Sequence, residues 1–450
     1  MTSVASSMIW SRAAANDLAR GLLTPLTWSI LSYSAEQAVR SHYRAWGVTL
    51  PADAPIWRRM EGRAYLNTTV LTAADQAVTE GDVQATSGWR LFSRGPDRRQ
   101  NIVLRQQMEQ APAVFSAALR WWQQVQTMRW DQATVLQVME EIEPRAEAVL
   151  TTRDFLETGL GAARRQLTRW LAEWLPDSGD AIFDQLFAGL DGREGWAQYR
   201  YDWQRLTEGA RQNAAVVAYL ADRSWQTPAQ SGNAPTPDQV VQSLPDGAFR
   251  RSVAAFVADY ARWADQPLEI ASPRWAEAPQ TLLTRLAARL AEPPEAPLPS
   301  PAAAQQRRAE AGRAVVAQVG AKRRRQFEPV FDQLQQIVAL MPASREALVT
   351  VMAAARYWAL GAAQEAAHDD RLTAAEDVFL LELEELKQIM TGEWHDPEQV
   401  QPLADQRRAE QAAWAMLEPA EVVEGRGEGA GEWGEGSGDW GVGRGGATVG

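Results

Sequence analysis

The chain has 450 residues, of which 46% are hydrophobic and 23% are charged, and its formal net charge is -12. This length allows a large buried core divided over subdomains, and the negative charge argues against nucleic-acid binding, which needs clustered cations. Cysteine is absent, which excludes disulfides, zinc–thiolate sites and thiol nucleophiles. A charged signal-peptide start and an apolar run of about 18 residues are both missing, so we expect a cytoplasmic protein with no membrane contact.

Amphipathic helices are the predicted elements from residue 100 to residue 415, where strand signals are almost missing. One helical stripe, with apolar residues at i, i+3, i+4, i+7 and i+8, comprises Leu167, Trp170, Leu171, Trp174 and Leu175. In a later helix Asp246 is a suitable N-cap, and the apolar face comprises Phe249, Val253, Phe256, Val257 and Tyr260. Because such stripes must pack against one another, we predict a mainly α fold, a bundle of amphipathic helices with little strand near the two ends.

Two segments rich in turn-forming residues interrupt the helices. Residues 226–238 contain several Pro, Gly, Ser and Asn residues, and residues 292–301 are too rich in proline to be helical. From Glu424 the composition shifts to Gly, Glu and Trp, which is typical of a disordered segment. We therefore predict one helical domain over residues 1–423, divided into subdomains near 226–238 and 292–304, followed by a tail at 424–450.

The three histidines, His42, His368 and His395, give weak signals for chemistry. Glu365 and His368 have the Glu-x-x-His spacing of carboxylate-bridged di-metal bundles, in which both side chains point inward from one helix. Such sites need two copies of the motif and the chain has one, so we interpret the two residues as a surface pair. We predict no metal site on this chain.

The 20 tryptophans allow two interpretations. Trp170 and Trp174 lie on an apolar stripe and are expected in the core. Trp121, Trp122 and residues 196–203 adjoin Arg and Gln, which would suit a pocket for a flat or macrocyclic ligand through stacking and cation–π contacts. Core packing is the favoured interpretation of these residues too, and the pocket remains the alternative.

Five short motifs follow one another along the chain. They are residues 10–28, Gly62-Arg63-Ala64-Tyr65-Leu66-Asn67, Glu269 with the segment 272–279, Arg345-Glu346, and residues 377–386. Their sequence and order resemble the middle domain of the phosphoenolpyruvate-utilising enzymes, a family that includes phosphoenolpyruvate synthase and the rifamycin-inactivating phosphotransferases. Residues 441–450 resemble the first strand and turn of that family's phosphohistidine domain, which would then be truncated before its reactive histidine.

The resemblance implies a helical domain that binds a small-molecule phosphoryl acceptor and presents it to a mobile phosphohistidine domain. The residues that match family motifs and could line the acceptor site are Arg12, Thr24, Thr27, Arg63, Tyr65, Asn67, Glu269 and Arg345. Structural roles are the alternative for them. Thr24 could cap a helix that has Pro25 at its first position, and Arg345-Glu346 could form an ion pair.

Departures from the family pattern bear on activity. The family's Tyr-Gly-His-Arg becomes Tyr260-Ala261-Arg262-Trp263, which replaces an imidazole with a permanent cation. In the family's opening motif the Asn, the first Gly, the Glu and the Pro are all replaced in this chain, and only Asp17 keeps the chemistry, as a shorter carboxylate. Phosphoryl transfer from ATP also needs a phosphate cradle and a basic clamp, but the chain has no Gly-x-x-x-x-Gly-Lys loop and no histidine in a carrier context.

These observations lead to two hypotheses of function. The first is a stand-alone acceptor-binding component of a phosphoenolpyruvate synthase-like or rifamycin phosphotransferase-like system. It would have no catalytic residue and no cofactor of its own, and partner chains would supply ATP, magnesium and the phosphohistidine. The alternative is a degenerate, non-catalytic homologue that binds a small molecule or acts as a scaffold.

Overall fold

The computed structural model describes residues 7–16, 18–86, 96–177, 179–190, 194–223, 236–368, 371–394 and 397–426. Most of these residues are helical, and the described strands lie close to the two ends of the chain, so the prediction of a mainly α fold is confirmed. The first half contains α1 (Arg12–Ala15), α2 (Pro25–Ala45), α3 (Thr68–Thr86), α4 (Pro96–Gln126), α5 (Gln132–Trp174), α6 (Gly179–Leu186), α7 (Ala197–Arg211) and α8 (Ala214–Asp222). The second half contains α9 (Pro237–Gln242), α10 (Gly247–Asp259), α11 (Pro279–Ala291), α12 (Pro301–Gln318), α13 (Ala321–His368), α14 (Leu383–Thr391) and α15 (Val400–Ala415).

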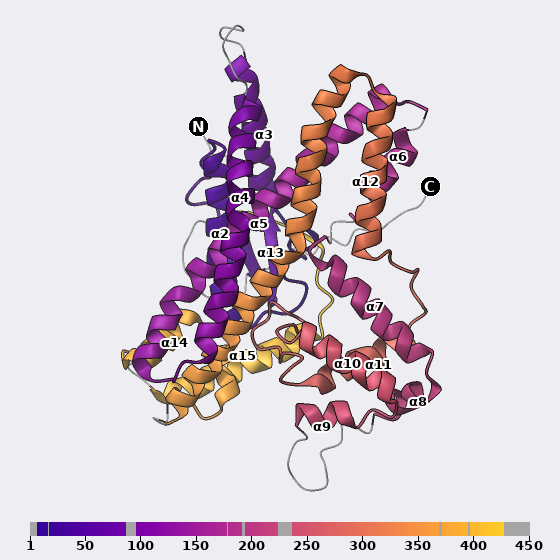
Figure 1. The fold of residues 1–450 in the computed structure, drawn as a ribbon. Coiled ribbons are helices and arrows are strands. Elements are labelled where there is room, and N and C mark those ends of the chain that lie inside the picture. The colour runs from indigo at the N-terminus through magenta and orange to yellow at the C-terminus, as the bar shows by residue number, and fades with distance from the viewer. Residues whose placement is uncertain are drawn as a thin grey trace, which may run out of the picture.

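The two longest helices, α5 and α13, form the centre of the bundle (Figure 1). Helix α13 packs on α5 and α4, and α2 packs on α5. Of the described helices, α13 alone is long and apolar enough to span a membrane, but 67% of its most apolar window is buried inside the fold. That burial is typical of the core helix of a bundle.

The predicted helical stripes are confirmed. Leu167, Leu171 and Trp174 belong to a second core cluster between the C-terminal half of α5, α6, α12 and the start of α13. Asp246 caps α10 by accepting a hydrogen bond of 2.6 Å from the backbone of Phe249. Val253 on the same helix face is fully buried.

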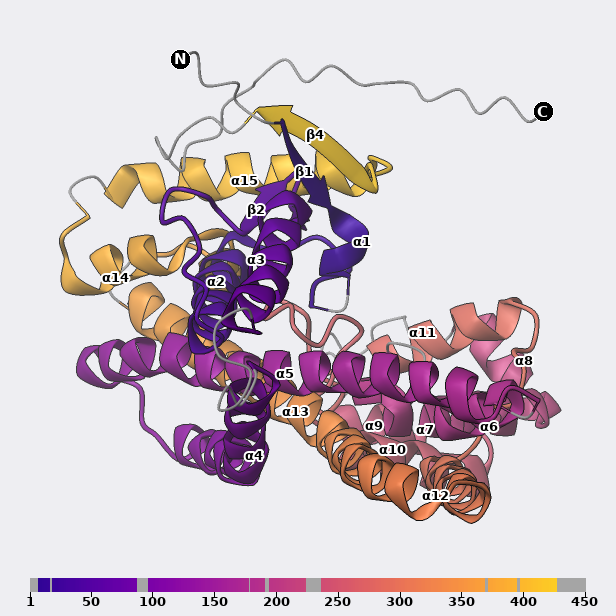
Figure 2. The ribbon, with the colours of Figure 1, turned by 90° about the horizontal axis from the view of Figure 1, so that it is seen from above.

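A small antiparallel sheet joins the two ends of the described chain. It contains β1 (Ser7–Ser11), β2 (Trp57–Met60), β3 (Arg63–Asn67) and β4 (Val422–Arg426), in the order β2-β3-β1-β4. Trp10 on β1 pairs with Asn67 on one side and with Val423 on the other. Figure 2 shows β1 and β4 side by side.

The outer segments of the predicted domain organisation are only partly described. The predicted tail boundary at Glu424 falls inside β4, so the first residues of the predicted tail form part of a strand, and the division into domain and tail stays a prediction. Residues 427–450, including the segment 441–450, lie outside the described residues. The same is true of residues 226–235.

The second predicted connection is a defined structure. Residues 292–300 form a mostly exposed, extended connection between α11 and α12, and α12 begins at Pro301 inside the predicted range. Gln204 on α7 donates to the carbonyl of Ala296 (2.8 Å) and accepts from the amide of Leu298 (2.7 Å). The connection is therefore held against α7, while the division into subdomains stays a prediction.

Candidate functional site

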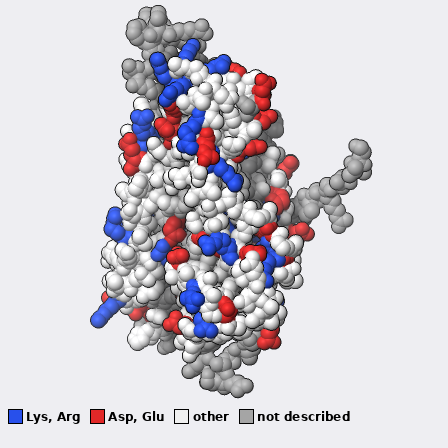
Figure 3. All heavy atoms as spheres, turned by 45° about the vertical axis from the view of Figure 1, so that its right-hand side comes forward, with Lys and Arg blue, Asp and Glu red and all other residues white. Residues whose placement is uncertain are grey.

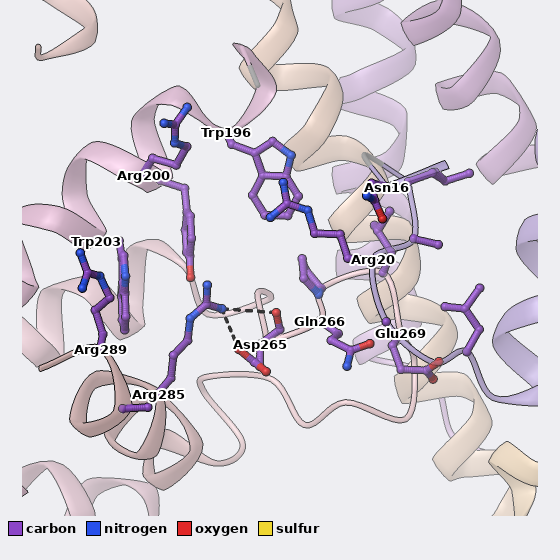
Figure 4. A pocket seen from close by; sticks show the side chains of 18 of the residues that line it. Asn16, Arg20, Trp196, Arg200, Trp203, Asp265, Gln266, Glu269, Arg285 and Arg289 are labelled. Atoms are coloured by element: carbon purple, nitrogen blue, oxygen red, sulfur yellow. Dashed lines mark hydrogen bonds and ion pairs between the residues drawn. The ribbon is translucent and has the colours of Figure 1, made fainter. Parts of the chain in front are cut away.

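A cavity of about 530 Å³ lies between α7, α11, the connection 292–298 and two loops, residues 16–23 and 265–269 (Figure 4). This volume is within the range of roughly 300–1,000 Å³ that is usual for small-molecule sites. Three regions of the chain contribute walls, residues 16–23, 196–203 and 265–298. The charged and aromatic side chains that line it are Arg20, Trp196, Tyr199, Arg200, Trp203, Asp265, Glu269, Arg285, Arg289, Glu292 and Glu295.

The aromatic wall comes from α7 and the residue before it. Trp196, Tyr199 and Trp203 have helical i, i+3 and i+7 spacing, so they lie on one face. The inner side of this face is part of the core, because Tyr199 stacks on Trp263 with ring centroids 4.5 Å apart. Burial raises the pKa of Tyr199 to about 12, so its hydroxyl stays neutral at physiological pH. The stretch 196–203 thus combines the two interpretations, core packing and pocket lining.

The other tryptophan pair that the sequence analysis considered for a pocket is not there. Trp121 is 1% exposed and belongs to the core. Trp122 makes an edge contact with Tyr357, with ring centroids 6.1 Å apart. Neither residue lines the cavity.

Helix α11 supplies the basic wall through Arg285 and Arg289, which are four residues apart on one helix face. Arg285 forms an ion pair of 2.8 Å with Asp265 and lies over the ring of Trp203, 5.1 Å from its centroid. In Figure 4 its guanidinium is seen between Trp203 and Asp265. Arg289 forms an ion pair of 2.9 Å with Glu295.

The loop 16–23 is held from behind by the sheet and by α15. Arg59 and Gln411 both donate to the carbonyl of Leu23, at 2.9 and 3.0 Å. The amide of Leu23 donates to the carbonyl of Gly62 (2.8 Å), which has a φ of +71°, a conformation that favours glycine. The wall is therefore positioned by hydrogen bonds to the backbone of Leu23 rather than by its own secondary structure.

Of the eight predicted acceptor-site residues, Glu269 alone lines the cavity, and its carboxylate is turned to α2. One oxygen accepts hydrogen bonds from the hydroxyls of Thr24 (2.8 Å) and Thr27 (2.6 Å), and the other accepts from the amide of Thr24 (2.8 Å). Thr24 also caps α2, with Pro25 at the first position, as the structural alternative predicted. Thr27 is fully buried. These three residues form a clamp between α2 and the loop 265–269.

Four predicted site residues lie on or beside the sheet, away from the cavity. Arg63 donates to the carbonyl of Leu417 (3.2 Å), Tyr65 donates to the carbonyl of Ala420 (2.8 Å), and Arg12 pairs with Glu421. They therefore hold the segment that leads into β4.

Asn67 has a structural role of another kind. Its amide donates to the carbonyl of Pro55 (3.0 Å), and its oxygen accepts from the amide of Val70 (3.1 Å) in the first turn of α3. Asn67 is fully buried.

Arg345 lies one layer behind the cavity wall. It is 1% exposed, and its guanidinium lies over the Trp196 ring, 4.1 Å from the centroid. Burial, together with the positive charge of Arg153, holds the pKa of Arg345 well below its ordinary value. The predicted partner of Arg345 in the motif, Glu346, instead pairs with Arg262 and accepts a 2.6 Å hydrogen bond from the indole of Trp263.

The described histidines do not form a site. His42 is 5% exposed between α2 and α5, and burial lowers its pKa to about 4. His368 ends α13 with an exposed side chain, and His395 lies outside the described residues. Among the described residues there is no cluster of three His, Cys, Asp or Glu side chains that could hold a metal.

On the face in Figure 3, basic and acidic side chains are interspersed.

Residues 139–346 match the family model of the rifampicin phosphotransferase fourth domain. This part of the chain is similar to that domain of a phosphotransferase, so the predicted resemblance is confirmed over these residues. The matched range includes α7, α11, the loop 265–269 and the connection 292–298, which form most of the cavity. The loop 16–23 lies outside the range. No curated protein matches the chain.

Proposed function

We propose that this chain binds a small-molecule phosphoryl acceptor in the cavity between α7 and α11. The cavity carries the proposal, because most of its walls lie inside the part of the chain that matches a phosphotransferase domain. Aromatic rings and arginines line it, and these groups recognise flat ligands by stacking and by hydrogen bonds. The domain's name gives rifampicin as the acceptor of its enzyme, so rifampicin is the first ligand to test.

The chemical step needs groups from outside these residues. Phosphoryl transfer depends on a phosphate cradle, a basic clamp and magnesium, and we propose that separate ATP-binding and phosphohistidine domains supply them. The role of this chain is then to bind the acceptor and hold it in place for the transfer. We propose that it does so in the cytoplasm. Alone, the chain is expected to bind without transferring.

The proposal is tested by calorimetry with rifampicin on two matched variants. Trp203→Ala removes a ring from the cavity wall. Trp170→Ala removes a ring that stacks on Trp174 (4.9 Å) and does not line the cavity. We expect Trp203→Ala to weaken binding by roughly tenfold, the effect of losing one buried aromatic contact, and Trp170→Ala to leave it unchanged. Equal binding by the two variants would contradict the assignment of the cavity.

A degenerate, non-catalytic binder remains the second candidate, and one observation favours it. The positions that replace the family's Gly-His-Arg now have structural partners: Arg262 pairs with Glu346, and Trp263 stacks on Tyr199. A mixture of this chain with ATP-binding and phosphohistidine domains of the family, magnesium and labelled ATP separates the candidates. Labelled ligand supports the acceptor-binding component, whereas binding without labelling supports the degenerate binder.

A further inference from the structure

We infer that the ligand of this cavity is a planar aromatic anion, such as an aryl carboxylate, whose ring stacks on tryptophan and whose charge is held by Arg285 and Tyr199. The inference rests on the proposed function, because it specifies the ligand of the same cavity. Three features of the lining carry it: arginines behind the aromatic rings, acidic partners placed toward solvent, and a buried hydroxyl that needs a partner.

The two tryptophans of the wall each have an arginine over one ring face. The guanidinium of Arg345 lies 4.1 Å from the Trp196 ring centroid, and that of Arg285 lies 5.1 Å from the Trp203 ring centroid. The face of an aromatic ring is partly negative and repels anions. A cation over one face offsets this repulsion, so these rings can stack with a negatively charged ring better than isolated tryptophans can.

The ion pairs of the lining have their positive members inside and their negative members outside. The side chain of Arg289 is 14% exposed, whereas those of Glu292 and Glu295 are 64% and 65% exposed. Arg285 is 33% exposed and its partner Asp265 is 59% exposed. Water and salt screen the exposed carboxylates more strongly than the less exposed guanidinium groups. The interior of the cavity is therefore positive, although the four arginines of the lining are matched by four carboxylates.

Tyr199 brings a hydroxyl to the same place. Its side chain is 4% exposed and lines the cavity, and its oxygen has no hydrogen-bond partner among the described residues. Arg285 and Asp265 line the same cavity as Tyr199.

Arg285 still has donors for a ligand. Its hydrogen bonds to other described residues use Nη1, to the backbone and the side chain of Asp265, whereas a guanidinium has five N–H donors. A neutral O–H beside a cationic N–H fork suits the two oxygens of a carboxylate.

The test uses 2-naphthoate and its neutral counterpart 2-naphthamide, with affinities measured by ligand-observed NMR at low ionic strength. We expect naphthoate to bind at least about fivefold more tightly, and this preference to decrease as salt is added. Tyr199→Phe, which keeps the ring and removes the hydroxyl, should weaken naphthoate roughly tenfold and naphthamide less, because hydrogen bonds to charged groups are stronger.

Arg285→Gln should abolish the preference for naphthoate. Because this substitution also leaves the Asp265 carboxylate without its partner, a second variant tests whether repulsion by Asp265 causes the loss. Arg285→Gln combined with Asp265→Asn restores the balance of charge but not the cation, so it should still show no preference. The control is Arg323→Gln, which removes a similar arginine over Trp174 (5.5 Å from the centroid) outside the cavity and should leave the preference intact.

The outcomes distinguish this inference from the proposed function. If naphthamide binds as tightly as naphthoate, the assignment of an anionic ligand is wrong while the cavity stays a small-molecule site. If the double variant regains the preference for naphthoate, Arg285 does not hold the ligand's charge and that part of the inference is wrong. If naphthoate, naphthamide and rifampicin all fail to bind, the cavity is not that site and both statements are overturned.

Discussion

Replacing Glu269 with alanine tests whether this residue holds the fold together rather than the ligand. The substitution removes the acceptor of four hydrogen bonds, from the amide of Thr24, the hydroxyls of Thr24 and Thr27, and the amide of Ala271, at 2.6 to 2.8 Å. A hydrogen bond to a charged group contributes about 1.5–3 kcal/mol, and the contributions are not additive. Because Thr27 keeps the amide of Ile270 as a partner (3.0 Å), we expect a loss of about 4 kcal/mol in the free energy of unfolding.

Urea denaturation, followed by tryptophan fluorescence and by circular dichroism, measures this loss, and coincident curves from the two probes justify a two-state treatment. Thr27→Val is the matched smaller change, because it removes one hydroxyl of the same clamp and should cost about 1–2 kcal/mol. The double variant should be less destabilised than the sum of the two single variants, with a coupling energy of about 1–2 kcal/mol. If Glu269→Ala unfolds within about 1 kcal/mol of the wild type, the clamp is not structural and the original assignment of Glu269 to the acceptor site regains its force.

Two further predictions concern the bundle. Burial lowers the pKa of His42 to about 4 from 6.5, so the folded state binds fewer protons than the unfolded state between these values, and stability falls by up to roughly 3 kcal/mol as the pH falls through this window. His42→Phe should remove that part of the acid sensitivity in urea denaturation at pH 7 and pH 4, and an unchanged pH dependence would contradict the assignment. Gly361→Ala places a Cβ 2.4 Å from the Trp130 ring and should lower stability by about 1–3 kcal/mol. Gly209→Ala, in a helix with nothing within 4 Å, should raise it by about 0.5–1 kcal/mol, and equal effects of the two substitutions would show that the Trp130 contact is not close.

The helices could be predicted because their signals are local. The stripe that contains Leu167 and Leu171 and the N-cap at Asp246 both appear where the sequence places them. The strands depend on partners far along the chain, since β1 pairs with β4 across more than 400 residues. For that reason the composition after Glu424 suggested a disordered tail, although the first residues of that tail complete the sheet.

The site could be predicted only in part, because a sequence shows which residues share a helix face but not which faces converge. The tryptophans at 196 and 203 gave a usable signal, since their helical spacing places them together. Arg285 and Arg289 gave a similar signal on α11 that was missed. Nothing local connects either helix with the loop 16–23, which completes the cavity from the other end of the chain.

Most of the motif residues lie outside the cavity for a physical reason. Polar side chains that are buried must find hydrogen-bond partners, and a chain that joins its two ends needs such side chains to anchor the returning segment. Arg63 and Tyr65 do this by donating to the carbonyls of Leu417 and Ala420. A motif with such a structural role indicates the fold of the domain. From the sequence alone it cannot be distinguished from a motif that binds a ligand.

Arg345 shows how a motif residue can shape the cavity without lining it. Burying a guanidinium is costly unless other groups compensate for its lost hydration, and the ring of Trp196 at 4.1 Å offers part of that compensation. The same contact fixes the inner face of Trp196, so this ring has only its other face and its edge to present to the cavity. The position and the electrostatics of the cavity wall therefore depend on a residue that does not line the cavity, and the shape of the cavity cannot be separated from the packing of α13 behind it.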